Sequence, residues 1–240
     1  MKPVLLLIPG MFNTVEVWEP VAAHLRSHAE IRVADVTTQE SIGAMAIDAW
    51  NMVAKLPPGT PLFVAGFSMG GYVLIELLAA HAAALDGVAF IDTSARTETP
   101  ETLLVREKTI AALERNFAKT VEGIIGYSLH PENQQNKALA DGMRSMMHGV
   151  GARTAIRQTR ALMVRSDRRD MLAQLRMPAL VVCGREDKVV PPEASAELAQ
   201  LIPGARLEWL DKSGHQTPLE QAEALAQLLL SLVQQAPENT

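Results

Sequence analysis

Short apolar runs alternate along the chain with segments in which apolar residues recur every three or four positions. Six runs predict strands, at 2–8, 31–35, 61–65, 88–91, 179–183 and 206–210. Helical spacing between and after them predicts helices at 18–28, 42–56, 72–81, 192–201 and 219–234. Short apolar strands that alternate with helices are typical of a parallel sheet covered on both faces. We therefore predict a three-layer α/β fold around a mostly parallel six-stranded sheet.

This alternation stops between residues 99 and 172, where helical spacing continues without a strand pattern. We expect a core made of residues 1–98 and 173–240, with residues 99–172 inserted as a helical cap. A polar stretch at 237–240 follows the last predicted helix and is expected to fray. Parallel sheets carry their chemistry at the carboxyl ends of their strands, so the residues just after each strand are the candidates for function.

The third predicted strand leads into the motif Gly66-Phe67-Ser68-Met69-Gly70. A serine between a strand and a helix adopts a strained backbone, which is tolerable when the residues two before and two after it lack side chains. Such a turn exposes the Ser68 hydroxyl and points the N–H of Met69 at whatever the hydroxyl attacks. The alternative is a glycine-rich turn with an idle serine.

A serine nucleophile needs a general base, and histidine has a pKa suited to that role near neutral pH. Of six histidines, only His215 follows a predicted strand, in a turn where Gly214 gives the backbone freedom. The remaining five fall in predicted helices or in the insertion, and we expect them to be surface or packing residues.

A carboxylate is needed to orient the imidazole and to stabilise its charged form. Asp187 follows the strand at 179–183 and lies between Ser68 and His215 in the chain, which gives the order Ser, Asp, His. Asp92, after the strand at 88–91, is the second candidate for the acid. Its alternative role is to cap the turn that follows it.

Composition excludes several other classes of function. The net charge of −5 argues against a nucleic-acid partner, because duplex binding needs a concentrated basic face. The single cysteine, Cys183, excludes an intrachain disulfide and ends an apolar strand, so we expect a core residue there. No apolar run is long enough for a membrane span and no signal-peptide cleavage site follows the first strand, so we expect a cytoplasmic protein without membrane contact. The triad chemistry requires neither a metal nor a cofactor.

Three motifs occur in the order Gly66-Phe67-Ser68-Met69-Gly70-Gly71, Gly184-Arg185-Glu186-Asp187-Lys188-Val189-Val190-Pro191 and Ser213-Gly214-His215. Through them the chain resembles the α/β-hydrolase fold family along nearly its whole length. The resemblance implies a nucleophile at Ser68, an acid at Asp187, a base at His215 and an oxyanion hole made by the N–H groups of Met11 and Met69.

Two departures from the family pattern accompany the resemblance. Pro9-Gly10 stands where many members have His-Gly, although the backbone N–H of Met11 is still available as a donor. The chain also begins at what corresponds to the family's third strand, so we expect a sheet trimmed to six strands.

A serine rather than an aspartate in this motif favours acyl transfer, and we expect a carboxylic-ester hydrolase acting on a small ester or acyl substrate. Enol-lactonase, C–C bond hydrolase, thioesterase and perhydrolase activities use the same triad and remain alternatives. A ligand-binding receptor without turnover is the alternative from another class. The oligomeric state is left open.

The cap is expected to decide which substrate enters. Phe12 and four cap methionines are the candidates for an adaptable substrate pocket, namely Met143, Met146, Met147 and Met163. The cap is also rich in arginine, with Asp167 and Asp170 as its only acidic neighbours in the sequence. These arginines are Arg144, Arg153, Arg157, Arg160, Arg165, Arg168 and Arg169. They form a solvated helix face or attract an anionic substrate or an acidic carrier protein, as in the similar pimeloyl-carrier methyl esterase.

Overall fold

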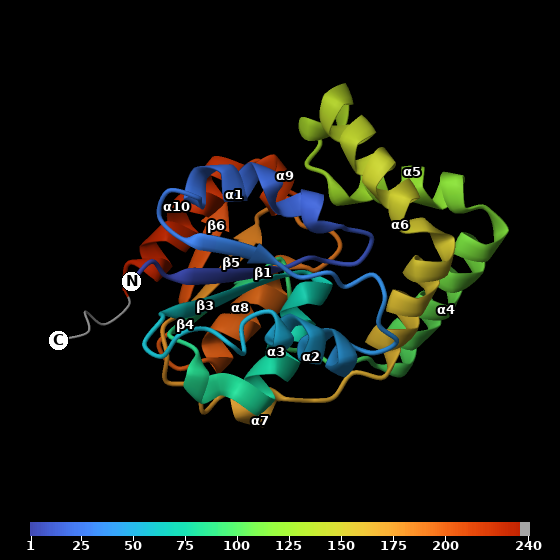
Figure 1. The fold of residues 1–240 in the computed structure, drawn as a ribbon. Helices are drawn as coiled ribbons and strands as arrows, with labels where there is room; N and C mark the ends of the chain where they lie inside the picture. Colours follow the sequence, from blue (N-terminus) through green and yellow to red (C-terminus); the bar gives the residue numbers. More distant parts are fainter. Residues whose placement is uncertain (236–240) are drawn as a thin grey trace.

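Six parallel strands form one sheet in this computed structural model, which describes residues 1–235 (Figure 1). In spatial order the strands are β2 (Glu30–Val33), β1 (Val4–Ile8), β3 (Leu62–Phe67), β4 (Gly87–Ile91), β5 (Ala179–Gly184) and β6 (Arg206–Leu210). Every neighbouring pair runs parallel. The predicted α/β fold with a six-stranded sheet is confirmed, and the tail predicted at 237–240 lies outside the described residues.

Helices cover both faces of this sheet (Figure 1). One face carries α1 (Glu19–Leu25), the short α9 (Thr217–Glu220) and α10 (Ala222–Val233). The opposite face carries α2 (Ile42–Asn51), α3 (Met69–His81) and α8 (Pro192–Leu201). Single turns of 3-10 helix occur at Val15–Trp18, Ala82–Ala84 and Asn133–Gln135.

The apolar runs are continuous in β1, β3, β4 and β5 because these inner strands are buried from both sides, whereas the edge strands β2 and β6 are partly exposed and contain charged residues. In β1, Leu5 and Leu7 pack among the residues of α1 and α10, whereas Leu6 and Ile8 pack among those of α2 and α3. Successive side chains of a strand point to opposite faces, so a strand between two helical layers needs an apolar residue at every position.

Several boundaries differ from those that the apolar pattern predicts. The strand expected at 31–35 ends at Val33, because the Asp35 carboxylate accepts hydrogen bonds from the N–H and hydroxyl of Thr37 and turns the chain. The helix expected at 219–234 is divided at Gln221 into α9 and α10. The helices expected at 18–28 and 42–56 end earlier, at Leu25 and Asn51.

Four helices lie between β4 and β5 in the chain: α4 (Pro100–Arg115), α5 (Phe117–Ser128), α6 (Lys137–Met163) and α7 (Arg169–Leu172). We call α4, α5 and α6 the inserted helices; they stand together beside the sheet (Figure 1). Helix α6 bends at Gly151, whose backbone has φ 76° and ψ 162°. The division into a core at 1–98 and 173–240 and a cap at 99–172 stays a prediction.

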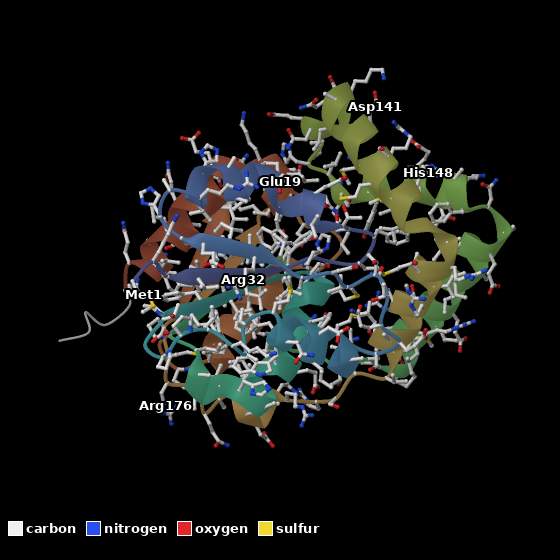
Figure 2. All side chains as sticks on the ribbon, viewed as in Figure 1. Met1, Glu19, Arg32, Asp141, His148 and Arg176 are labelled. Atoms are coloured by element: carbon white, nitrogen blue, oxygen red, sulfur yellow. The ribbon has the colours of Figure 1, made fainter. Side chains whose placement is uncertain are left out.

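Helix α6 is amphipathic before its bend. Asp141 and His148 point outward to solvent (Figure 2), whereas Met143 and Met147 are buried in a cluster that also contains Phe12 and residues of α5. The inserted helices therefore pack directly on the loop that follows β1.

Within residues 1–235, none of the helices combines the length and apolar character that crossing a bilayer requires. The cytoplasmic location stays a prediction.

Candidate active site

Ser68 occupies the single-residue turn between β3 and α3, with φ 52° and ψ −116°. A positive φ at a residue with a side chain costs about 1–3 kcal/mol and persists only where neighbours enforce it. A Cβ atom at Gly66 would clash with the carbonyl of Gly70, and one at Gly70 would clash with the carbonyl of Ile8. The two glycines therefore allow the close packing of strand and helix that holds Ser68 in this turn.

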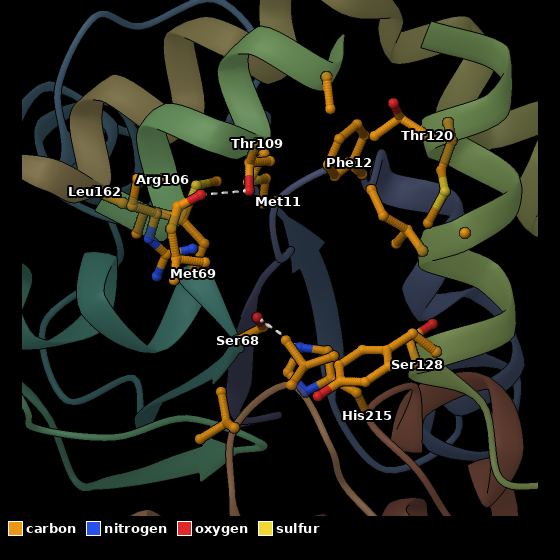
Figure 3. Close-up of a pocket in the computed structure, with 18 of the residues that line it drawn as sticks. Met11, Phe12, Ser68, Met69, Arg106, Thr109, Thr120, Ser128, Leu162 and His215 are labelled. Carbon is orange, nitrogen blue, oxygen red and sulfur yellow. Dashed lines mark hydrogen bonds between the residues drawn. The ribbon is translucent and has the colours of Figure 1, made fainter. Parts of the chain in front are cut away.

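Ser68, His215 and Asp187 form a continuous chain of hydrogen bonds. Ser68 Oγ lies 2.9 Å from His215 Nε2 (Figure 3). On the other side of the ring, His215 Nδ1 lies 2.8 Å from Asp187 Oδ2. Asp187 Oδ1 accepts hydrogen bonds from the N–H groups of Val189 at 2.8 Å and Val190 at 3.0 Å, which fix the carboxylate. The three side chains come from the ends of β3, β5 and β6, where the parallel sheet brings them together.

The environment of His215 favours its protonated form. Burial alone lowers the pKa of His215, but the charge of Asp187 and the hydrogen bond to it outweigh burial and raise this pKa above its usual 6.5. The same contact with Asp187 fixes the tautomer that leaves Nε2 free to accept the Ser68 proton.

Glu220 of α9 holds the loop that carries His215. Its Oε1 accepts hydrogen bonds from the N–H groups of Gly214 at 2.9 Å and Gln216 at 3.1 Å, on either side of the histidine. The N–H of His215 itself donates to the carbonyl of Ser128, the last residue of α5, at 2.6 Å. Sequence reasoning missed Glu220, although a carboxylate five residues after the histidine was a visible signal.

Met11 and Met69 line the cavity beside Ser68 (Figure 3). Met69 begins α3, and the first N–H groups of a helix have no partner within the helix. Met11 precedes Phe12, whose φ of 65° turns the loop after β1. The N–H of Phe12 donates to the side chain of Gln158 at 3.1 Å.

A cavity of about 1020 Å³ opens over Ser68 between the sheet and the inserted helices (Figure 3). Its described lining contains no aspartate or glutamate. Four cationic side chains line it instead, namely Arg106, Arg115, Lys119 and Lys188. Arg106 pairs with Glu98, so the net positive character comes from the other three. The sequence-based prediction did not include these four residues, because only their position around the cavity distinguishes them from other surface cations.

The cavity takes in two of the five expected pocket residues, Phe12 and Met147. Met143 and Met146 lie outside the lining because they are buried in packing clusters, and Met163 at the end of α6 also lies outside it. For these three methionines the pocket role stays a prediction, and the structure does not bring them to this cavity. Helical spacing placed them on apolar faces without showing which face meets the cavity.

Asp92 is fully buried and connects the end of β5 to the start of α9. Its carboxylate accepts hydrogen bonds from the N–H groups of Gly184 at 2.9 Å and Thr217 at 3.2 Å. Burial, followed by the nearby charge of Asp187, raises the pKa of Asp92 to about 8. His215 contacts Asp187, not Asp92.

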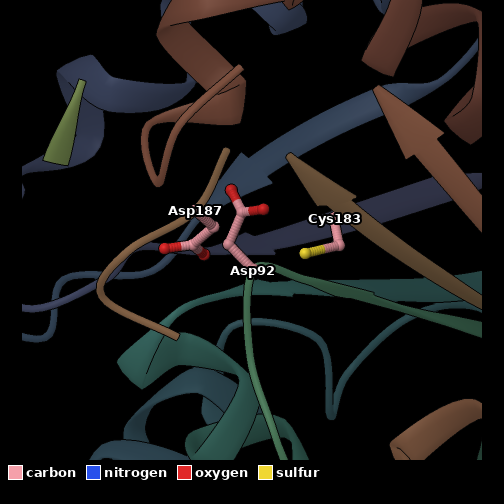
Figure 4. A group of neighbouring side chains, drawn as sticks. All are labelled: Asp92, Cys183 and Asp187. Atoms are coloured by element: carbon pink, nitrogen blue, oxygen red, sulfur yellow. The ribbon is translucent and has the colours of Figure 1, made fainter. Parts of the chain in front are cut away.

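Cys183 lies next to these two carboxyl groups, and one ligand atom from each of Asp92, Cys183 and Asp187 falls within 4.8 Å of the others (Figure 4). Both carboxylates already accept backbone N–H groups. Burial raises the pKa of the Cys183 thiol, which keeps it protonated and unreactive.

Most of the arginines near the inserted helices are engaged in ion pairs. Arg144 pairs with Glu122 and Asp141, Arg157 with Glu40, Arg165 with Glu98, Arg168 with Glu76 and Arg169 with Asp167. The expectation that they meet only Asp167 and Asp170 is wrong, because most of their partners are distant in sequence.

The chain is similar to known hydrolases in sequence and in structure. The family model Hydrolase_4, described as serine aminopeptidase S33, matches residues 35–222. A pimeloyl-acyl-carrier-protein methyl ester esterase of Neisseria meningitidis serogroup C is 27% identical over 181 residues, which cover 73% of this chain and 70% of the relative. The enzyme of that name from Xanthomonas campestris is 25% identical over 253 residues, covering 98% of this chain and 96% of the relative.

Two solved structures share the fold. A thermophilic esterase from Thermogutta terrifontis superposes with a TM-score of 0.87 at 23% identity, over 99% of this chain and 91% of that one. The enol-lactonase from Burkholderia xenovorans gives a TM-score of 0.85 at 20% identity, over 98% and 92%. Because the family model spans well over half of its length, the chain belongs to the Hydrolase_4 family and has the α/β-hydrolase fold.

Proposed function

We propose that this protein is a carboxylic-ester hydrolase in which Ser68 is the nucleophile, His215 the base and Asp187 the acid. The observation that carries the proposal is the unbroken set of hydrogen bonds from Ser68 Oγ through His215 to Asp187, at the floor of a large cavity. Its relatives among the pimeloyl-acyl-carrier-protein methyl ester esterases support an ester as the bond that is cleaved.

The reaction follows from the roles that these positions allow. Ser68 attacks the ester carbonyl while His215 takes its proton, and the tetrahedral oxyanion accepts hydrogen bonds from the N–H groups of Met11 and Met69. His215 then protonates the leaving alcohol. Water, activated by His215, hydrolyses the acyl-enzyme and restores Ser68. Atoms and charge balance with these residues and water alone.

Residues 99–172 act as a cap in this proposal. The inserted helices supply much of the cavity wall, including Thr109, Ile124 and Met147, and leave the site reachable from the side of α4 and α5. Enclosure by the cap shields the acyl-enzyme from bulk water and selects the substrate by shape.

We further propose that the substrate carries an anionic group, either free or on an acidic carrier protein. Support comes from Arg115, Lys119 and Lys188 in a described lining without carboxylates. The relatives named as pimeloyl-acyl-carrier-protein methyl ester esterases also support it, because their substrate is attached to an acyl carrier protein. These three cations, which we call the positive rim, attract anionic substrates and raise their rate of encounter with the enzyme.

Labelling with a fluorophosphonate probe and steady-state hydrolysis of p-nitrophenyl acetate, butyrate and octanoate test the reaction. Wild type should label and turn over all or part of this series, whereas Ser68→Ala should do neither. Labelling without turnover of any ester, lactone or thioester would favour a receptor. Full activity in Ser68→Ala would overturn the assignment of the nucleophile.

A further inference from the structure

The loop after β1 needs an external support. Phe12 has a positive φ of 65°, a conformation that a residue with a side chain adopts only under constraint. Inside the loop, Asn13 Nδ2 donates to the carbonyl of Met11 at 2.8 Å and the Asn13 N–H reaches the carbonyl of Gly10 at 3.3 Å. These contacts tie the loop to itself but not to the rest of the protein.

Gln158 connects the backbone of this loop to the inserted helices, and the Thr159 hydroxyl beside it reaches only the Met11 side chain, at Sδ. Its side chain is fully buried and lies on α6 after the bend at Gly151. Its Oε1 accepts the hydrogen bond from the N–H of Phe12 at 3.1 Å, and its Nε2 donates to the carbonyl of Val36 at 2.9 Å. One carboxamide therefore joins α6, the loop after β1 and the loop after β2.

The bond from Phe12 reaches the peptide unit next to the expected oxyanion donor. The carbonyl of Met11 and the N–H of Phe12 belong to one peptide group, whose oxygen accepts from Asn13 and whose N–H donates to Gln158. The N–H of Met11 belongs to the preceding peptide group, whose carbonyl, that of Gly10, accepts from the N–H of Asn13 at 3.3 Å. Because hydrogen bonds hold the peptide planes on both sides of Met11, the direction of the Met11 N–H has little freedom left.

We infer that Gln158 is a positioning residue for the oxyanion hole: from the inserted helices it sets the direction of the Met11 N–H toward the substrate carbonyl. It does not touch the reacting atoms. The inference rests on the proposed function, because it gives the Met11 N–H the role of oxyanion donor.

Loss of this acceptor should weaken binding of the transition state more than binding of the ester. A buried N–H without a partner is costly, so the loop relaxes and the donor moves away from the oxyanion. Removing one oxyanion donor outright reduces kcat by about 10²–10³. Displacing it through Gln158 should cost a part of that, at least about 10-fold in kcat, with KM changed less than about 3-fold.

Three variants test this reading on the full chain. Gln158→Leu removes both hydrogen bonds while keeping the bulk of the side chain. Gln158→Glu keeps an acceptor for the Phe12 N–H and, when burial keeps the carboxyl group protonated, also a donor for Val36. Arg157→Leu is the matched control. Arg157 donates to the carbonyl of Thr37, the residue after Val36, and so connects the same helix to the same loop without contacting Phe12.

The measurements are kcat and KM for p-nitrophenyl butyrate, the inhibition constant of a boronic acid that mimics the tetrahedral intermediate, and the thermal melting temperature. Gln158→Leu should lower kcat at least 10-fold and weaken the boronic acid in parallel, Gln158→Glu should recover most of that loss, and Arg157→Leu should retain wild-type kcat.

Equal losses in Gln158→Leu and Arg157→Leu, or a rise in KM at unchanged kcat, would overturn the inference. So would a Gln158→Glu variant that folds and is as impaired as Gln158→Leu. If Gln158→Leu does not fold, Gln158→Glu and the boronic acid still decide. An active Ser68→Ala variant would refute the proposed function, whereas an inactive one beside a fully active Gln158→Leu would refute this inference alone.

Discussion

At the scale of single residues, the site contains three buried ionisable groups that lie close to one another. His215 touches Asp187 directly, and Asp92 lies close enough for its charge to act on both. Water is largely excluded there, so each charge strongly affects the protonation of its neighbours. The consequences are visible in the pH dependence of activity and of stability.

Activity should rise with pH as His215 becomes neutral, with a midpoint above 6.5 because the pKa of His215 is raised. Asp187→Asn removes the charge that raises this pKa, so the midpoint should move to lower pH while kcat falls by a factor on the order of 10⁴. A pH–rate profile of both proteins checks this, with Asp170→Asn on α7 as the control. An unchanged midpoint in Asp187→Asn would contradict it.

Asp92 should make the wild type lose stability as pH rises. Its pKa in the folded protein is raised from 3.8 to about 8, so unfolding releases a proton throughout that range. Stability that is fully present below pH 3.8 is therefore lost progressively up to about pH 8. Asp92→Asn lacks this ionisation and gives up one of two acceptors for backbone N–H groups.

Thermal melting of both proteins at pH 5, 7 and 9 tests this expectation for Asp92. The melting-temperature advantage of the wild type over Asp92→Asn should shrink from pH 5 to pH 9. A constant difference at all three pH values would show that the carboxyl group ionises normally.

At the scale of elements, the short helix α9 matters more than its four residues suggest. Through Glu220 it joins the His215 loop to the segment after α5, since Glu220 Oε2 accepts from the N–H of His130 at 2.8 Å and from Asn133 Nδ2 at 2.7 Å. A carboxylate that accepts hydrogen bonds from four donors holds these segments together firmly, because hydrogen bonds to a charged acceptor are strong.

Glu220→Gln should therefore misplace His215. The amide keeps one acceptor oxygen and puts an N–H₂ group where the other oxygen accepted, so backbone N–H groups of the loop lose their partners. We expect kcat to fall at least about 10-fold while KM stays within about 3-fold, as for a lost transition-state interaction. Steady-state kinetics check this beside Glu223→Gln, an exposed substitution at the start of α10. Equal activity of the two variants would contradict the role of Glu220 in positioning His215.

The packing of strands and helices also explains which parts of the fold and of the site could be predicted from the sequence. The six strands and most helices followed from apolar spacing, because the four inner strands are buried on both faces. Ser68, Asp187 and His215 were singled out because each follows a predicted strand, and the structure brings their side chains together. Gln158 was not found, since its partners are backbone groups far away in the chain. Glu220 was missed although two of its partners are nearby in the chain, because a carboxylate after a histidine does not show which backbone groups it binds. The same limit applies to the cap methionines, because a helical pattern shows an apolar face but not what it contacts.

At the scale of the whole molecule, an acidic protein surrounds a cavity whose described lining has only positive charges. The net charge is −5, yet Arg115, Lys119 and Lys188 border the site without a carboxylate beside them in the lining. The contrast should focus anionic substrates on the opening and repel them elsewhere.

Reversing two of these charges, in Arg115→Glu with Lys119→Glu, should lower kcat/KM for an ester with a free carboxylate by at least about 10-fold and leave a neutral ester within about 2-fold. Added salt should reduce the wild-type preference for the anionic ester, because screening shortens the range of attraction. Arg153→Glu, an exposed reversal outside the lining, is the control. Equal effects on both esters would argue against the positive rim.

The inserted helices contact the loop after β1 and the His215 loop through hydrogen bonds, among them those from Phe12 to Gln158 and from His215 to the carbonyl of Ser128. Engineers who exchange this segment between relatives to transplant substrate preference would remove both supports along with the pocket wall. A chimera built on this scaffold therefore needs a glutamine and a helix end at the two equivalent places before its new specificity can be expressed as turnover.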